Sequence, residues 1–270
     1  MISFPNAKIN IGLLITGKRP DGFHNLETVF FPVKWSDALE IAYSEELNFS
    51  SSGIEIACSS ESNLVMKAYQ LISEDFNIPP LRIHLHKQIP FGAGLGGGSA
   101  DGAFMLRMLN KTFALNISHE KMIEYAARLG SDCPFFMINQ PVFATGRGEV
   151  MSPIHISLKG LSLLMVKPSV VVSTASAFRY VVAQQPENSL LDLVQLPVTE
   201  WKGNIFNQFE TSVFQQFPEI EEIKNQLYNM GAIYASMSGS GSCVFGLFVE
   251  LPENVETFFP STCLVFSQQI

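Results

Sequence analysis

A predicted strand and a predicted helix are joined by a glycine-rich stretch, Pro90-Phe91-Gly92-Ala93-Gly94-Leu95-Gly96-Gly97-Gly98-Ser99-Ala100. Before it, the apolar residues Leu81, Ile83 and Leu85 alternate with polar ones, which is typical of a half-buried strand. After it, an apolar run over residues 103–109 predicts a buried helix. Glycine lets the backbone approach a ligand closely, and the start of a helix offers free N–H groups at the positive end of its dipole. This order of elements therefore indicates a phosphate-binding loop built from backbone groups.

Other structures also explain a glycine cluster, and a flexible linker or a tight turn is the plainest of them. The stretch is not a Walker A loop, because no lysine follows its last glycine. Gly92-x-Gly94-x-x-Gly97 matches a dinucleotide-binding fingerprint literally, but that fold needs an acidic residue on a second strand about 20 residues later. Glu120, the residue near that distance, lies in a predicted helix. Ser99 could add its hydroxyl to a phosphate or to a bound magnesium ion.

The composition limits the classes of protein that fit. The chain has 270 residues, which suits one large domain or two modest ones. Hydrophobic residues make up 47% and charged residues 16%, so the chain as a whole is not disordered. Its formal net charge of −8 argues against a general electrostatic grip on nucleic acid or on an anionic membrane. A small phosphorylated ligand is not excluded, because backbone N–H groups can hold phosphates locally.

The N-terminal residues and the cysteines favour a cytoplasmic protein. The apolar run over residues 9–15 is too short to span a membrane, and it lacks the basic flank and cleavage site of a signal peptide. No pair of cysteines forms a C-x-x-C motif, so a zinc ribbon or a thioredoxin-type site has no support. Isolated thiols in a reducing cytoplasm are expected to be buried apolar groups, and here they are Cys58, Cys133, Cys243 and Cys263.

The predicted elements mix strands and helices without a regular βαβ rhythm. In the first half we expect strands over 5–16, 26–35, 37–43 and 81–86, and further helices over 63–75 and 118–129, capped by Asn63 or Ser62 and by Ser118. In the second half we expect strands over 161–167, 234–237 and 243–248, and helices over 175–184 and from Pro218 to Gly231. This pattern favours an α+β fold in two parts over a doubly wound parallel sheet. The parts are predicted to be residues 1–155 and 156–270, although composition marks the boundary only weakly.

Five segments resemble motifs of the GHMP kinases, the family that includes galactokinase, homoserine kinase and mevalonate kinase. The glycine stretch is similar to the family's phosphate loop, which reads Pro-x-x-x-Gly-Leu-Gly followed by small residues. Residues 16–28, which include Arg19-Pro20-Asp21-Gly22-Phe23-His24, resemble the substrate-binding turn of one branch of the family and are the most specific segment. The remaining matches are Ala7-Lys8-Ile9-Asn10, Gly130-Ser131-Asp132-Cys133-Pro134 and Ser238-Gly239-Ser240-Gly241-Ser242.

The resemblance implies a fold and an activity. It implies a two-part α+β fold with an N-terminal nucleotide-binding part, a smaller C-terminal part and the active site in a cleft between them. That branch uses ATP to phosphorylate the 2-hydroxyl of 4-diphosphocytidyl-2-C-methyl-D-erythritol in the non-mevalonate isoprenoid pathway. Magnesium is expected with ATP, although no carboxylate identifies itself as its ligand. The partner is then a small molecule carrying cytidine diphosphate, not nucleic acid or membrane, and the protein is expected to be a monomer or a weak homodimer.

Three departures and two alternatives accompany this resemblance. Phe23 stands where tyrosine is commoner, Ala100 where a second serine is usual, and Gly102 where alanine is usual. A missing hydroxyl at position 100 would weaken one phosphate contact and leave the backbone cradle intact. The alternatives are another GHMP kinase, of the homoserine or mevalonate type, and a nucleotide-binding protein that has lost catalysis. The turn at residues 19–24 argues against the first, and the presence of both Lys8 and Asp132 argues against the second.

The resemblance assigns catalytic roles to Asp132 and Lys8. An aspartate is a suitable acceptor for the proton that the acceptor hydroxyl must lose. From the sequence alone, the favoured explanation of Asp132 is the N-cap of a helix that starts at Pro134, and that of Lys8 is a solvated lysine on an edge strand. The resemblance reverses this preference for Asp132, and capping and catalysis could coexist. Paired with Asp132, the Lys8 ammonium would keep the carboxylate ionised and polarise the hydroxyl.

Four further residues are predicted to bind the substrate. Asn10 faces the same side of its strand as Lys8, although it could also be a polar surface residue. Phe23 could stack on cytosine, and His24 could hydrogen-bond the edge of the base, although a lone histidine is often structural. Phe178 is a candidate for a second stacking ring or simply a core residue. The turn at residues 238–242 either connects two strands or backs the phosphate loop.

Overall fold

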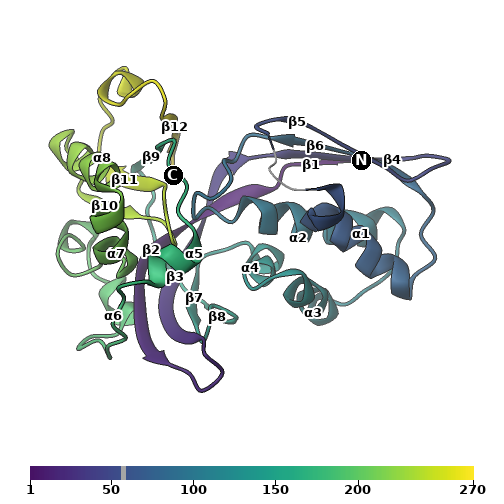
Figure 1. Cartoon of the computed structure of the whole chain (residues 1–270), viewed down its shortest axis with the longest axis horizontal. Coiled ribbons are helices and arrows are strands. Elements are labelled where there is room, and N and C mark those ends of the chain that lie inside the picture. The colour runs from purple at the N-terminus through teal and green to yellow at the C-terminus, as the bar shows by residue number, and fades with distance from the viewer. Residues whose placement is uncertain (56–58) are drawn as a thin grey trace. The chain divides into compact units, whose positions relative to one another are not determined.

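The computed structural model of the chain describes residues 1–55 and 59–270, and these form two compact units (Figure 1). Unit 1 contains Met1–Lys8, Pro32–Phe91 and Gly96–Gln140. Unit 2 contains Ile9–Phe31, Gly92–Leu95 and Pro141–Ile270. The chain passes from one unit to the other several times, and two of these crossings lie inside the glycine stretch itself, after Phe91 and after Leu95. The predicted boundary near residue 155 stays a prediction, because the units are built from interleaved segments.

Unit 1 contains a mixed sheet with the strand order β1-β4-β6-β5. The strands are β1 (Ile2–Ser3), β4 (Ala38–Tyr43), β5 (Asn48–Gly53) and β6 (Leu81–Lys87). β6 pairs antiparallel with β4 and parallel with β5. Leu81, Ile83 and Leu85 are buried, whereas the residues between them are not, which confirms the alternation seen in the sequence.

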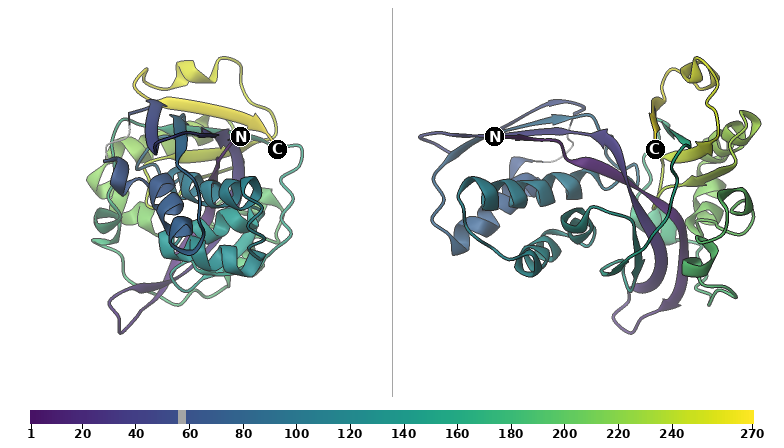
Figure 2. Two further views of the ribbon diagram at one scale, coloured as in Figure 1. Left: turned by 90° about the vertical axis from the view of Figure 1, so that its right-hand side faces the viewer. Right: turned by 180° about the vertical axis from the view of Figure 1, so that it is seen from behind.

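Helices cover one face of this sheet (Figures 1 and 2). They are α1 (Leu64–Asp75), α2 (Gly97–Thr112), α3 (His119–Leu129) and α4 (Cys133–Ile138), with a short 3-10 turn at Ser60–Ser62. The side chains of Asn63 and Ser118 cap α1 and α3 by accepting hydrogen bonds from the backbone N–H groups of Val65 and Lys121, as predicted. Gly102 lets α1 and α2 approach closely, because a Cβ atom there would lie 3.0 Å from the Cβ atom of Leu64.

Unit 2 holds most of a long, bent antiparallel sheet with the order β2-β3-β7-β8. Its strands are β2 (Asn6–Lys18), β3 (His24–Ser36), β7 (Val142–Thr145) and β8 (Val150–Pro153). β2 and β3 are the strands expected over residues 5–16 and 26–35. The turn between them carries residues 19–23, so the most specific sequence motif lies at the end of a hairpin.

A second sheet in unit 2 is antiparallel, with the order β10-β11-β9-β12. Its strands are β9 (Ser162–Lys167), β10 (Tyr234–Met237), β11 (Val244–Phe248) and β12 (Leu264–Gln269). The helices α7 (Phe209–Gln216) and α8 (Pro218–Asn229) pack on it and close a hydrophobic core (Figure 1). Leu13 and Ile15 of β2 belong to the same core, so the two sheets share one interior.

Short helical segments complete unit 2, and one of them corrects a sequence prediction. They are α5 (Thr174–Phe178), α6 (Leu190–Leu193) and the 3-10 turns Val198–Glu200 and Val255–Phe258. The helix predicted over 175–184 is wrong in its length, because α5 ends at Phe178. The chain then runs irregularly, and the N–H of Gln184 bonds to the carbonyl of Ile15 on β2 at 2.9 Å. Ser173 caps α5, because its side chain accepts a hydrogen bond from the N–H of Ser176.

The observed mixture of helices and strands confirms the predicted α+β class. Cys133 and Cys243 are buried and Cys263 is half-buried, all as free thiols, and Cys58 lies outside the described residues. Within residues 1–55 and 59–270, no helix is long and apolar enough to cross a membrane.

Candidate active site

Lys8 and Asp132, separated by most of the length of unit 1 in sequence, lie side by side in its structure. The Nζ atom of Lys8 is 3.7 Å from Oδ2 of Asp132. The Lys8 side chain is 4% exposed, so it is not a solvated lysine on a strand edge. Asp132 is 36% exposed. It occupies the N-cap position of α4, but its side chain makes no capping hydrogen bond. Its carboxylate therefore pairs with Lys8 and still reaches solvent, as a proton acceptor requires.

Burial sets the protonation behaviour of Lys8. Removal of the ammonium from water lowers the pKa of Lys8 below its ordinary value of 10.5, and the neighbouring Asp132 carboxylate only partly opposes this. The lysine is thus held in a dry environment by the protein, with its charge directed at one carboxylate. A buried charge of this kind acts more strongly on a nearby reacting group than an exposed one does.

The glycine stretch passes directly beside this pair. Gly96 has a φ of +70° and precedes the first residue of α2. A Cβ atom at Gly96 would lie 3.3 Å from Cε of Lys8 and 3.0 Å from Cζ of Phe136. A side chain is therefore disfavoured there by both backbone conformation and space. The N-terminal turn of α2, with Gly97, Gly98 and Ser99, consequently begins next to the Lys8 side chain.

The other predicted loop residues divide between packing and exposure. Pro90, Ala93, Leu95 and Ala100 are buried, whereas Phe91 is exposed. Ala100 is completely inaccessible to solvent within α2. Gly92, Gly94 and Gly96 all have φ between +62° and +74°, which is the conformation that the glycines were expected to supply.

Within unit 2, the turn at residues 238–242 packs against the first half of the loop. The Ser238 hydroxyl donates to the carbonyl of Gly94 at 2.9 Å. The N–H groups of Ser242 and Cys243 donate to the carbonyls of Gly92 and Ala93 at 3.4 Å and 3.2 Å. A Cβ atom at Gly94 would collide with the carbonyl of Ser238. The same turn connects β10 to β11, which pair antiparallel, so both sequence interpretations hold: it joins two strands and it packs against the glycine stretch.

A buried cluster in unit 1 was not predicted. Lys87 Nζ donates to Asp101 Oδ2 at 2.8 Å and also bonds to Asp37. Asp37 Oδ1 accepts from the N–H groups of Gln88 and Ile89 at 2.6 Å and 2.8 Å. The cluster thereby fixes the end of β6 and the start of α2 on either side of the glycine stretch. The available signal was the alternation of β6, since Lys87 continues the inward-facing series of Leu81, Ile83 and Leu85.

The cluster carries perturbed charges. Burial raises the pKa of Asp101 well above its usual value. The positive charge of Lys87 opposes this rise, and the negative charge of Asp37 adds to it. Burial would lower the pKa of Lys87, but the carboxylates of Asp101 and Asp37 outweigh it, and the pKa of Lys87 is raised. Asp101 Oδ1 is buried without a hydrogen-bond partner. A donor from a bound molecule would satisfy it.

A pocket of about 290 Å³ in unit 1 adjoins this cluster. Its walls include the apolar side chains of Leu64, Ile89 and Pro90 and the polar residues Asn63, Lys87 and Asp101. Gly98, at the start of α2, also lines it. The pocket therefore lies at the same helix N-terminus that the glycine stretch leads into, and it offers apolar walls with a few polar groups, as small-molecule sites commonly do.

The predicted substrate residues lie in unit 2, and two of them are brought together. The rings of His24 and Phe178 stack with centroids 4.8 Å apart and an interplanar angle of 21°. Phe178 also packs edge-on against Phe209, so the core interpretation of Phe178 holds alongside its contact with His24. Phe23 is 54% exposed, with the Arg147 guanidinium 4.6 Å from its ring centroid. Arg147 was not predicted as a site residue, and its place between two glycines was the only signal.

Asn10 is buried and hydrogen-bonded, so it is not a polar surface residue. It is 2% exposed, and its Nδ2 donates to the hydroxyl of Thr28 at 2.8 Å. Its backbone N–H donates to the Ser238 hydroxyl at 3.1 Å. Asn10 is thus held from both its side chain and its backbone.

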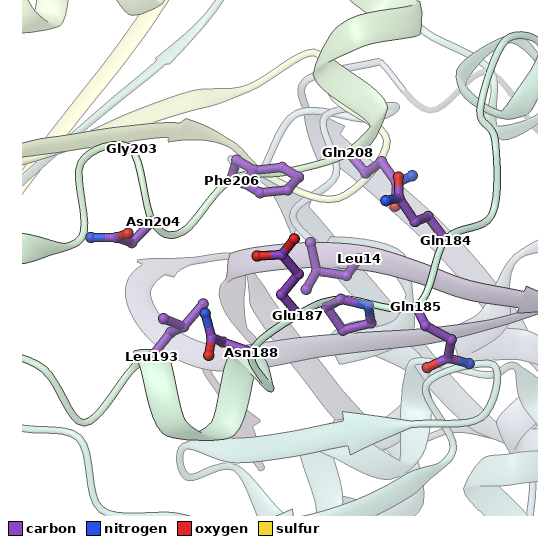
Figure 3. A pocket seen from close by; sticks show the side chains of 11 residues that line it. Leu14, Gln184, Gln185, Glu187, Asn188, Leu193, Gly203, Asn204, Phe206 and Gln208 are labelled. Carbon is purple, nitrogen blue, oxygen red and sulfur yellow. The ribbon is translucent and has the colours of Figure 1, made fainter.

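Another pocket, of about 350 Å³, lies in unit 2, and none of the predicted site residues line it (Figure 3). It is lined largely by amide side chains, with Leu14, Glu187 and the ring of Phe206 among them. In the described part of the chain, no group of three or more histidine, cysteine, aspartate or glutamate residues is arranged to hold a metal ion.

The sequence matches two models of one protein family. The model for the GHMP kinases N terminal domain matches residues 63–146, and the model for the GHMP kinases C terminal matches residues 195–263. A relative from Bacteroides fragilis is 57% identical over 252 residues, covering 92% of each chain, and one from Parabacteroides distasonis is 50% identical over all 270 residues of both. Both relatives are named 4-diphosphocytidyl-2-C-methyl-D-erythritol kinase.

Solved structures agree with the sequence relatives. The crystal structure of a 4-(cytidine 5'-diphospho)-2C-methyl-D-erythritol kinase superposes with a TM-score of 0.82 at 28% identity, covering 99% of this chain and 98% of the other. The mevalonate kinase of Methanococcus jannaschii superposes with a TM-score of 0.71 at 13% identity, covering 100% and 98%, which is a likeness of fold alone.

Proposed function

Because this chain belongs to the GHMP kinase family, we propose that it transfers the γ-phosphoryl group of ATP to the 2-hydroxyl of 4-diphosphocytidyl-2-C-methyl-D-erythritol. This places it in the non-mevalonate route to isoprenoids. The observation that carries the proposal is the Lys8–Asp132 pair beside Gly96 of the glycine stretch, in a chain whose close relatives bear that name. The homoserine and mevalonate kinases among the solved structures share only its fold, at 12–17% identity.

The pair supplies the acid–base part of the reaction. Asp132 accepts the proton of the acceptor hydroxyl while the oxygen of that hydroxyl forms a bond to the γ-phosphorus of ATP. The bond from the γ-phosphorus to the oxygen that bridges it to the β-phosphorus breaks, and ADP leaves. Lys8, whose Nζ lies 3.7 Å from that carboxylate, orients it and polarises the reacting oxygens from its buried position. The backbone N–H groups at the start of α2 hold the phosphates without needing a basic surface. Magnesium is expected to enter with ATP and, when bound, neutralises phosphate charge.

We assign the nucleotide and the acceptor to different residues. The pocket lined by Asn63, Lys87 and Asp101 adjoins the N-terminus of α2, which supports it as the site of the nucleoside end of ATP. The rings of Phe23, His24 and Phe178 are flat and partly accessible, which supports stacking and edge recognition of cytosine. Asn10, on the same strand as Lys8, is proposed to orient the acceptor.

The setting of the activity is also a proposal. We propose that the protein works in the cytoplasm as a monomer or weak homodimer, on small molecules and not on nucleic acid or membranes. The net charge of −8 supports the last point, because nucleic-acid binding draws mainly on contacts between basic side chains and phosphates.

A coupled kinase assay tests the function directly. We expect ADP release with ATP and 4-diphosphocytidyl-2-C-methyl-D-erythritol, and none with methylerythritol phosphate, homoserine or mevalonate. Transfer to methylerythritol phosphate at a similar rate would remove cytosine recognition from the proposal. Transfer to homoserine or mevalonate alone would favour another GHMP kinase. Nucleotide binding without transfer to any acceptor would favour a protein that has lost catalysis.

A further inference from the structure

Asn207 is a buried amide in unit 2 whose polar atoms are all bound to neighbouring backbone. It is 1% exposed. Its Nδ2 donates to the carbonyls of Met237 and Gly239, each at 2.7 Å. Its Oδ1 accepts from the N–H of Phe209 at 3.0 Å. A primary amide has two N–H donors, so Asn207 uses both of them on two carbonyls that flank Ser238.

The segment around Asn207 is itself fixed to β2. The N–H of Leu13 donates to the carbonyl of Phe206 at 3.0 Å, and the N–H of Gln208 donates to the carbonyl of Leu13 at 2.7 Å. Phe206 and Gln208 line the amide-rich pocket (Figure 3), whereas Asn207 between them bonds to the turn. Asn207 therefore links β2 to the turn at residues 238–242.

That turn contacts the proposed nucleotide-binding loop and also the proposed acceptor-binding residue Asn10. The Ser238 hydroxyl donates to the carbonyl of Gly94 in the phosphate loop and accepts from the N–H of Asn10. A Cβ atom at Gly239 would lie 3.2 Å from the Gly94 carbonyl oxygen and 3.3 Å from Oδ1 of Asn10. A shift of the turn would therefore move the loop glycine and the proposed acceptor-binding asparagine together.

Glu210, on α7, also bonds to the backbone that enters this turn. We call the hydrogen bonds of Asn207 and Glu210 to Met237 and Gly239 the clamp. Glu210 Oε1 accepts from the N–H of Met237 at 2.8 Å, and the N–H of Glu210 donates to the carbonyl of Asn207 at 2.9 Å. Met237 is thus held at its N–H by Glu210 and at its carbonyl by Asn207. The backbone entering the turn has little freedom left.

We propose that Asn207 is a positioning residue of the kinase reaction, which sets the place of the Ser238 hydroxyl and, through it, of Gly94 and Asn10. Asn207 touches no reacting atom, because it is buried and its amide is committed to backbone. The inference rests on the proposed function, since it concerns the nucleotide and the acceptor of that reaction.

The test compares Asn207→Asp with a matched loss of packing. Aspartate keeps the shape but has no N–H donor, and its carboxylate would face two carbonyls. We expect the Kd for ADP, measured by calorimetry, to rise by about tenfold or more, with a fall in kcat, because small misplacements are costly for catalysis. Val213→Ala is the control. Val213 is fully buried in the hydrophobic core of unit 2, and its side chain takes no part in the hydrogen bonds of the clamp. It should lower Tm yet keep the Kd and kcat within about twofold of the wild-type values.

The pH profile separates positioning from general damage. A buried aspartate facing carbonyls gains a donor when it binds a proton, so the ADP affinity of Asn207→Asp relative to wild type should rise as pH falls from 8 to 6. Wild-type affinity in Asn207→Asp, or an equal loss in Val213→Ala, would overturn the inference. If Asn207→Asp does not fold, Ser238→Ala is the deciding variant, because it removes the hydroxyl through which the turn contacts Gly94. Unchanged ADP affinity in Ser238→Ala would also overturn the inference. If the wild-type protein binds no nucleotide, the proposed function fails instead.

Discussion

Asp132 occupies a helix-capping position without capping the helix. Its carboxylate lies 3.7 Å from the ammonium of Lys8 and is 36% exposed. A capping aspartate would bond to backbone N–H groups within the first turn of α4 and would be held there by them. The side chain is instead paired with a lysine that burial keeps in place, which supports its assignment as the base.

Replacement of Asp132 by asparagine should separate catalysis from binding. We expect kcat of Asp132→Asn to fall by about 100-fold or more, since a general base contributes on that order. The Kd for ADP should stay within about twofold, because the phosphates are proposed to bind to backbone N–H groups and not to Asp132. Glu124→Gln is the control, as it neutralises an exposed carboxylate on α3 in the same unit. A kcat near the wild-type value in Asp132→Asn would remove Asp132 from the role of base.

The ends of β6 and α2 are tied together by the cluster of Asp37, Lys87 and Asp101. All three side chains are buried, and the single ammonium serves two carboxylates. Removal of one partner from a buried ion pair is costly, because the remaining charge is left in a low-dielectric interior. The glycine stretch runs between these two elements, so the cluster holds the backbone on both sides of the proposed phosphate loop.

Lys87→Met should therefore destabilise the protein far more than a comparable surface change. We expect a loss of about 3–5 kcal/mol in the free energy of unfolding, measured with urea. Lys121→Met, which breaks an exposed pair with Glu124, should cost about 1 kcal/mol or less. The triple variant Asp37→Asn, Lys87→Met, Asp101→Asn should recover much of the loss, since it leaves no unpaired charge. An equal effect of the two single lysine variants would contradict the structural role of the cluster.

The pH dependence of that difference has a definite sign. Burial would lower the pKa of Lys87, but Asp101 and Asp37 raise it above its ordinary value of 10.5. A group whose pKa is raised on folding contributes its stability fully below the unfolded value and loses it as pH rises through the folded value. On the alkaline side, the difference in unfolding free energy between wild type and Lys87→Met should therefore start to narrow above pH 10.5.

The elements with strong local patterns were predictable from sequence, and those set by distant contacts were not. The alternation in β6 and the caps Asn63 and Ser118 are local, and the structure has them as predicted. The helix predicted over 175–184 is wrong after Phe178, where the chain bonds to β2 instead, a contact that no local pattern announces.

The same distinction holds in the candidate site. The motif residues Lys8 and Asp132 could be paired only through the family resemblance, since more than 120 residues separate them. The cluster around Lys87 and the clamp at Asn207 escaped prediction, because each joins segments that carry no shared motif. Buried polar side chains were the missing class: they look like surface residues until the fold shows what covers them.

The two units are interleaved along the chain, and this changes what a cut near residue 155 should do. A fragment of residues 156–270 would contain β9 to β12 with α7 and α8, yet it would lack β2 and β3. Leu13 and Ile15 of β2 are buried at 4% and 0% exposure in the core that those helices close. Their loss would leave a cavity and an uncovered apolar surface in unit 2.

We therefore expect residues 156–270, expressed alone, not to form a native fold, although the predicted domain boundary would make them a domain. The measurement is the dispersion of backbone amide signals in an NMR spectrum, with the full chain as reference. Addition of residues 1–31 as a separate peptide should restore little, because Gly92–Leu95 also pack in unit 2, against the turn at 238–242. A dispersed spectrum from the fragment alone, with cooperative unfolding, would show instead that its helices and strands suffice for a core and that β2 is an addition to it.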